Sequence, residues 1–253
     1  MNDTKFVLAA PAKLTLSLRI TGLRPDGFHL IDAEMVTLDL ADSLAVDTSR
    51  TGLEIVGEFA ADLANGSESS EDNLAARALK LVNRQAHLVI TKNIPSGGGL
   101  GGGSADAAAI LRWAGFNDLT GAAKLGADVA FCMIGGRARV TGIGEVVNPL
   151  KKIPRKITLV VPPFRVSTPV VYRAYDELTD SCRKPLRVSG VNDLEPAATK
   201  VEPRLAEWKK KISHHAGTEP TLAGSGSTWW LDGEFADLKS QLPDATVILT
   251  QTN

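Results

Sequence analysis

A run of six glycines interrupted by one leucine is the first feature of the chain whose residue types could do chemistry. It reads GGGLGGG and is followed by a serine. Backbone N–H groups without side chains can converge on an anion, and a helix that follows directs its positive end toward the same point. The run therefore predicts a phosphate-binding loop, in which Ser104 caps the next helix or donates to a phosphate. The loop residues are Pro95, Ser96, Gly97, Gly98, Gly99, Leu100, Gly101, Gly102, Gly103 and Ser104.

Other classes of phosphate-binding loop also contain several glycines. A Walker A loop needs a lysine where Gly103 stands. A dinucleotide fingerprint can be threaded through Gly97, Gly99 and Gly102, but it needs a parallel sheet and an acidic residue after the next strand. Asp118 has about the right spacing and lies in a turn-like stretch. A flexible linker is disfavoured because a strand-like segment precedes the glycines and an alanine-rich helical segment follows.

Three further pieces could complete a phosphoryl-transfer site. They are Lys13 in PAKLTL, Asp128 in GADVAF and a second glycine cluster, AGSGS, over residues 223–227. Singly, each has a plain structural explanation: a solvated lysine, an aspartate that caps a turn or helix, and a tight turn. Phosphoryl transfer needs a phosphate cradle, a cation and a carboxylate that accepts the hydroxyl proton. Together with the glycine loop, Lys13 and Asp128 supply these parts.

The elements that must position these residues follow from local patterns. Strict alternation over Leu14–Ile20 predicts a half-buried strand with Lys13 and Thr15 on its polar face. A strand over 87–91 runs into the glycine loop, and a helix over 105–113 follows it. A short helix ending at Gly126 precedes Asp128.

The remaining segments alternate between strands and helices. We expect strands over 35–40, 44–48, 53–56, 157–161, 227–231 and 246–250, and a surface loop over 65–72. We expect a helix after Asp72 as its cap and a second helix with Thr168 as its cap and Pro169 in its first turn. Further helices are expected over 193–199, 203–213 and 235–242. The basic, proline-containing stretch 151–156 predicts a boundary between an N-terminal domain, 1–152, and a C-terminal domain, 153–253. The pattern predicts an α+β protein.

Composition limits the partners. The 253 residues are 43% apolar and 23% charged, with a formal net charge of −1. This balance gives no electrostatic reason to expect nucleic acid or a membrane as a partner, and no apolar run is long enough to span a bilayer. Cys132 and Cys182 lack metal-ligand spacing, so we expect buried or incidental thiols in a reduced cytoplasmic protein that is a monomer or weak homodimer.

The order of the motifs resembles the GHMP kinase superfamily. The matching stretches are PAKLTLSLRITGLRPDGFH, EDNLAARAL, IPSGGGLGGGSADAAA, LGADVAF, STPVVY and LAGSGS. They span nearly the whole chain, and DGFH with GGGLGGGS resembles the branch that acts on a cytidine diphosphate derivative of methylerythritol in the non-mevalonate isoprenoid pathway. The resemblance implies a ribosomal protein S5 domain 2-like N-terminal domain and a ferredoxin-like C-terminal domain. It also implies ATP with Mg²⁺ as cofactors.

The resemblance implies roles residue by residue. Asp128 would be the base that takes the proton from the substrate's 2-hydroxyl, and Lys13 would keep that carboxylate ionised and stabilise the transferred group. Asn73 and Lys92 match positions near the nucleotide, beside the glycine loop. The positions that match substrate contacts are Thr15, Phe28, His29, Thr168, Tyr172, Gly224, Ser225 and Gly226.

The aromatic pair Phe28 and Tyr172, with His29, would hold the cytosine, because a flat base needs faces to stack on and hydrogen-bonding groups for its edge. Two positions depart from the usual pattern of the superfamily branch: Thr15 replaces an asparagine and Ala130 a proline. Three alternatives stay open: a related kinase for another alcohol, a non-catalytic nucleotide-binding relative and a dinucleotide-dependent oxidoreductase.

Overall fold

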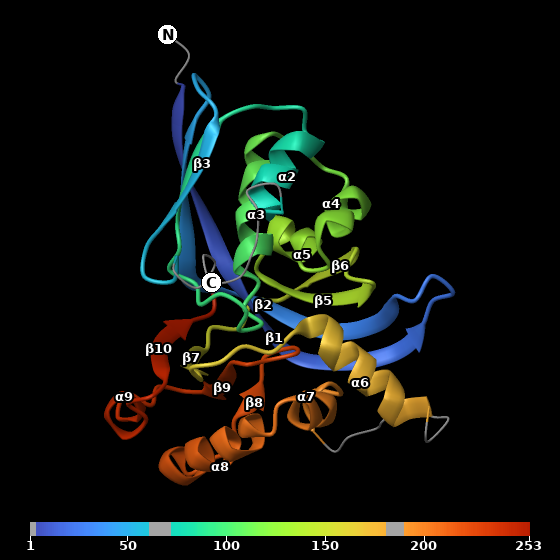
Figure 1. Cartoon of the computed structure of the whole chain (residues 1–253), viewed down its shortest axis with the longest axis vertical. Helices are drawn as coiled ribbons and strands as arrows, with labels where there is room; N and C mark the ends of the chain where they lie inside the picture. Colours follow the sequence, from blue (N-terminus) through green and yellow to red (C-terminus); the bar gives the residue numbers. More distant parts are fainter. Residues whose placement is uncertain (1–3, 61–71, 181–189) are drawn as a thin grey trace.

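The computed structural model describes residues 4–60, 72–180 and 190–253. Two β-sheets, each with its own group of helices, make up the molecule, so the α+β prediction is confirmed (Figure 1). The expected loop over 65–72 lies outside the described residues except for Asp72, and Cys182 lies outside them entirely. Within the described ranges, no helix is long and apolar enough to cross a bilayer.

A long antiparallel hairpin of strands β1 (Lys5–Leu23) and β2 (His29–Asp47) is the frame of the first sheet. The strand predicted over 14–20 is confirmed but extends further in both directions. The two strands predicted over 35–40 and 44–48 are parts of the single strand β2, because pairing with β1 carries it through the polar stretch between them. Residues 24–28 connect the two strands.

Four shorter strands complete this sheet: β3 (Gly52–Val56), β4 (His87–Thr91), β5 (Arg137–Gly142) and β6 (Val146–Leu150). One end of β2 pairs with β4 and the other end with β5, both antiparallel, and β3 pairs with β4 in parallel. The glycine loop thus follows a strand of a mostly antiparallel sheet. This setting rules out the parallel sheet that the oxidoreductase alternative required. Strands β5 and β6 were not predicted.

Helices α2 (Leu74–Leu81), α3 (Gly102–Trp113), α4 (Leu119–Leu125) and α5 (Val129–Ile134) gather on one side of the first sheet (Figure 1). Helix α3 is the central one and buries most of its alanines. The cap of α2 is Asn73 rather than the predicted Asp72. Its side-chain oxygen accepts from the N–H groups of the two residues after Leu74, and this satisfies donors that a helix start leaves unpaired.

The second sheet has the order β10-β7-β9-β8, formed by β7 (Lys156–Val161), β8 (Thr221–Leu222), β9 (Trp229–Asp232) and β10 (Thr246–Gln251). Its helices are α6 (Thr168–Asp180), α7 (Glu195–Val201), α8 (Arg204–Ala216) and α9 (Leu238–Gln241).

The start of α6 differs slightly from the prediction. The helix begins at Thr168, and the carbonyl of Ser167 accepts from Val170 and Val171. Ser167 therefore occupies the cap position that the sequence assigned to Thr168. Helix α9 is also shorter than predicted.

Apolar side chains from both sheets meet around the glycine loop. Leu14 of β1, Leu100 of the loop and Leu159 of β7 belong to one buried cluster, with Trp230 of β9 packed among them. The loop therefore lies at the junction of the two sheets. The predicted domain boundary at 152/153 stays a prediction.

Candidate active site

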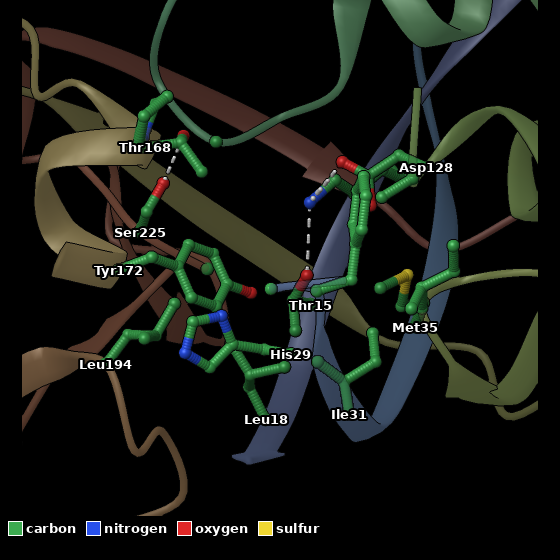
Figure 2. A pocket seen from close by; sticks show the side chains of 18 residues that line it. Thr15, Leu18, His29, Ile31, Met35, Asp128, Thr168, Tyr172, Leu194 and Ser225 are labelled. Atoms are coloured by element: carbon green, nitrogen blue, oxygen red, sulfur yellow. Dashed lines mark hydrogen bonds and ion pairs between the residues drawn. The ribbon is translucent and has the colours of Figure 1, made fainter. Parts of the chain in front are cut away.

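Lys13 and Asp128 meet at the junction between the two sheets. The Lys13 ammonium lies 3.1 Å from Oδ2 of Asp128 and 3.2 Å from the Thr15 hydroxyl (Figure 2). The β1–β2 register shifts between Pro11 and Lys13 and again between Thr15 and Ser17, and such bulges redirect side chains. The lysine side chain is 6% exposed and the aspartate 29%. The carboxylate is thus accessible while its cation is sheltered.

The polar face of β1 is less exposed than the alternation predicted. Lys13 and Thr15 are both buried, because they lie against Asp128 and the turn at Gly224 instead of facing solvent. The expectation of a half-buried strand is therefore wrong around these two residues. The same expectation is confirmed for Arg19, whose side chain is exposed.

The glycine loop packs too closely for side chains. A Cβ on Gly99, where φ is +80°, would lie 2.3 Å from the carbonyl oxygen of Ala223, and a Cβ on Gly98 would lie 2.5 Å from the Thr228 hydroxyl. A Cβ on Gly101, also at positive φ, would lie 2.7 Å from Cγ of Lys13. The backbone N–H of Lys13 donates to the Leu100 carbonyl at 3.0 Å. Glycine is required here because two separate segments, strand β1 and the turn over 223–228, press on the loop.

The N-terminus of α3 is left without a side-chain cap. Gly101 occupies the cap position in the left-handed conformation, and within the described ranges no side chain bonds to the first N–H groups of this 12-residue helix. Ser104 lies inside the first turn, so the prediction that it caps the helix is wrong. Its hydroxyl remains a candidate donor to phosphate. Uncapped N–H groups and the helix dipole together favour an anion at this point.

A second lysine cluster lies beneath the loop. The Lys92 ammonium hydrogen-bonds to Oδ2 of Asp42 and, at 2.7 Å, to Oδ2 of Asp106. All three side chains are at most 4% exposed. The other oxygen of Asp42 accepts from the backbone N–H groups of Asn93 and Ile94 at 2.6 and 2.8 Å. The cluster therefore ties β2, the segment after β4 and helix α3 together.

Burial shifts the ionisation of this triad. Desolvation raises the pKa of Asp106 to about 7, against the opposing effect of the Lys92 charge. For Lys92, burial lowers the pKa, but the charges of Asp106 and Asp42 outweigh it and the pKa rises. A Cβ on Gly102 would lie 3.2 Å from the Lys92 ammonium. Lys92 therefore supports the loop from below, and a direct contact with ATP stays a prediction, as it does for Asn73.

One cavity of about 460 Å³ connects Asp128 to an aromatic end. Lys13, Thr15, Gly99 and Asp128 line its polar end, and Figure 2 shows Tyr172 and His29 lying at the opposite end. Apolar side chains line the rest of the cavity. They are Leu18, Ile31, Met35 and Leu194.

The aromatic end brings together residues that are far apart in the sequence. The rings of His29 and Tyr172 have centroids 4.8 Å apart and an interplanar angle of 38°. Burial, followed by the negative charge of Asp128, raises the pKa of Tyr172, so its hydroxyl stays protonated. Phe28 lines the same cavity and is 58% exposed at the hairpin tip. The structure thus brings all three predicted clamp residues to one cavity.

The second glycine cluster closes the cavity from the other sheet. The hydroxyls of Thr168 and Ser225 lie 2.7 Å apart, and Gly224 and Ser225 line the cavity beside Thr168. Gly226 lies in the same turn, where its N–H donates to the Ala223 carbonyl.

Sequence reasoning missed Asn192. Its buried side-chain amide donates to the carbonyls of Leu222 at 3.0 Å and Gly224 at 2.7 Å, and its oxygen accepts from the Leu194 N–H. Asn192 therefore holds the second glycine cluster in place. In the sequence, an asparagine just before a helical segment predicts only a helix cap, so no local signal indicated this contact.

This geometry matches known proteins. Residues 73–136 match the family described as GHMP kinases N terminal domain. The 4-diphosphocytidyl-2-C-methyl-D-erythritol kinase of Paracoccus denitrificans is 37% identical over 234 residues, which cover 87% of this chain and 84% of the relative. The kinase of the same name from Cereibacter sphaeroides is 35% identical over 96% of this chain and 94% of its own.

A solved structure agrees with these relatives. The crystal structure of a 4-(cytidine 5'-diphospho)-2C-methyl-D-erythritol kinase superposes with a TM-score of 0.75 at 28% identity. It covers 98% of this chain and 99% of its own. The similarity thus extends across both sheets and the site between them. The chain belongs to the 4-diphosphocytidyl-2-C-methyl-D-erythritol kinase family of the GHMP kinases.

Proposed function

We propose that the protein transfers the γ-phosphoryl group of ATP to the 2-hydroxyl of 4-diphosphocytidyl-2-C-methyl-D-erythritol. The observation that carries the proposal is the single cavity that runs from the Lys13–Asp128 pair to the stacked rings of His29 and Tyr172. An alcohol attached to a nucleobase needs both ends at once. Membership of the family, and the names of its relatives, supply the substrate.

In the proposed reaction, Asp128 accepts the proton of the hydroxyl as the oxygen attacks the γ-phosphorus. The bond between the γ-phosphorus and the bridging oxygen breaks, and ADP leaves with that electron pair. Lys13, 3.1 Å from Asp128, stabilises the negative charge on the transferred group. The first-turn N–H groups of α3 and the glycine loop hold the phosphates of ATP.

Mg²⁺ fits this proposal as a companion of the nucleotide. Among the described residues, no group of three His, Cys, Asp or Glu side chains could hold a metal ion. Mg²⁺ needs no such cage, since it commonly binds phosphate oxygens, waters and one or two carboxylates. When bound, it would neutralise phosphate charge beside the Lys13–Asp128 pair, whose carboxylate is partly exposed.

The direct test is release of ADP in the presence of ATP and the cytidine diphosphate alcohol, followed by a coupled assay. We expect substrate-dependent ADP release that Asp128→Asn abolishes. ADP release no higher than in the Asp128→Asn protein would contradict the proposal. Phosphorylation of an alcohol without a nucleobase at an equal kcat/KM would instead support a related kinase with another substrate.

A further inference from the structure

His29 is held in one orientation by helix α6. Its Nε2 lies 2.6 Å from Oδ1 of Asp176, and its ring stacks on Tyr172. Tyr172 and Asp176 are four residues apart, so they lie on the same face of α6. The ring of Tyr175 meets the imidazole edge-on, with centroids 6.1 Å apart. One side of one helix therefore controls the position of the imidazole.

The partner of Nε2 decides what the other ring nitrogen can do. A carboxylate accepts hydrogen bonds but does not donate them, so the nitrogen facing Asp176 must carry a hydrogen. In a neutral imidazole the second nitrogen, Nδ1, then has a lone pair and accepts. No other hydrogen bond of the His29 ring is found within the described ranges, and the ring lines the cavity. Nδ1 is therefore available to a ligand.

We propose that Asp176 is a positioning residue that keeps His29 as a hydrogen-bond acceptor, so that the pocket selects cytidine over uridine nucleotides. Cytosine carries a 4-amino group, which donates, whereas uracil carries a 4-oxo group, which only accepts. If Nδ1 of His29 is an acceptor, it can accept a hydrogen bond from the 4-amino group of cytosine. The 4-oxo group of uracil would instead direct its lone pairs at the lone pair of Nδ1. This inference rests on the proposed function, because it takes the aromatic end of the cavity as the base site.

Asp176 can act in this way without touching the substrate. Its side chain is 42% exposed and does not line the cavity, whereas the His29 side chain is 11% exposed. Removing an exposed carboxylate from a helix surface leaves the core of α6 intact. Any change in base preference must then pass through His29.

The test uses CDP and UDP as probes, with binding measured by calorimetry at about pH 8.5, where an ordinary histidine is neutral. A polar group left unsatisfied at the base edge disfavours binding, so we expect the wild type to bind CDP roughly five to a hundred times more tightly than UDP. Asp176→Ala should bring this ratio close to one. Glu177→Ala, the neighbouring carboxylate of α6, which pairs with Lys200 outside the cavity, should leave the ratio unchanged.

A double variant separates positioning from a general structural effect. If Asp176 acts through His29, Asp176→Ala should not change the ratio in a His29→Ala background. An unchanged ratio in Asp176→Ala alone, or equal losses of CDP and UDP binding, would overturn the inference. Turnover of the cytidine diphosphate alcohol is a separate measurement. If the CDP to UDP binding ratios are as expected but no turnover is observed, the proposed function is refuted, whereas the inference about base selection still holds.

Discussion

Two lysine–aspartate clusters flank the glycine loop, and they differ mainly in their access to solvent. In the first, Lys13 pairs with Asp128, whose side chain is 29% exposed and borders the large cavity. In the second, Lys92 lies between Asp42 and Asp106, whose side chains are 0% and 4% exposed. The residue types are the same, but only the first cluster can meet a substrate.

The difference shows how burial assigns a role to a charge. Charged groups that are buried lose their hydration, and the free-energy cost must be offset by the interactions between them. Such a cluster holds the surrounding elements in place. Lys92 has two carboxylates to satisfy, one on strand β2 and one on helix α3. A carboxylate that keeps contact with the cavity is free to exchange a proton. The substitutions below are chosen to break one cluster without the other.

The largest expected effect is on catalysis, in the open cluster. Asp128→Asn keeps the size of the side chain but removes the proton acceptor, so we expect kcat to fall by about 10²–10⁴. The coupled ADP assay measures the rate. Thermal melting should show little change, because Asp128 reaches solvent. A variant that retains near wild-type kcat would show that another group accepts the proton.

Substitutions in the sealed cluster should lower the stability of the protein instead of its activity. Lys92→Met leaves two buried carboxylates without a cation, and we expect a loss of about 3–5 kcal/mol in the free energy of unfolding. Urea denaturation measures it. Lys13→Met is the matched control, because its partner Asp128 is partly hydrated. Equal losses in the two variants would show that the contrast between the clusters is not one of burial.

Substitutions at the aromatic end of the cavity should weaken the binding of one ligand only. Stacking on an aromatic ring contributes about 1–3 kcal/mol per base, so Phe28→Ala and Tyr172→Ala should weaken binding of the cytidine diphosphate alcohol by roughly five- to a hundredfold. ATP binding should be unchanged. Titrations with each nucleotide compare the two, and Tyr172→Phe should retain the binding that the ring provides. Equal loss of both nucleotides would refute the clamp assignment.

The sealed cluster should also make stability depend on pH. Asp106 has a pKa raised to about 7, whereas an unfolded aspartate titrates near 3.9, so the native state holds the extra proton between about pH 4 and 7. Stability from this group is therefore lost as pH rises through that window, by at most about 1.4 kcal/mol per pH unit.

Asp106→Asn does not titrate, so the difference in unfolding free energy between wild type and variant should fall with pH across the window. Denaturation at a series of pH values measures it. Asp32→Asn serves as a control of opposite sign, because the hydrogen bond from Arg139 lowers the pKa of Asp32. A flat difference for Asp106→Asn would mean that its carboxyl is already ionised at pH 5.

Local sequence was enough to predict the glycine loop between a strand and a helix, and the strand that carries Lys13. Glycine runs and strict alternation act over a few residues, so their structural meaning does not depend on distant partners. The α+β class followed in the same way. Strands β5 and β6 were not predicted, because each is short and depends on pairing with a neighbouring strand. That neighbour is β2 for β5 and β5 for β6.

Which lysine faces the cavity was decided by the tertiary structure alone. Lys13 and Lys92 both have apolar neighbours in the sequence, and the local pattern does not indicate which of the two is sealed from solvent. Asp42 lies 50 positions before Lys92, and Asp106 lies 14 positions after it. Only the packed sheet and helix bring these charges together and exclude water from them. By itself, the sequence determined the chemical groups, whereas their burial, and with it their roles, depended on contacts between distant segments.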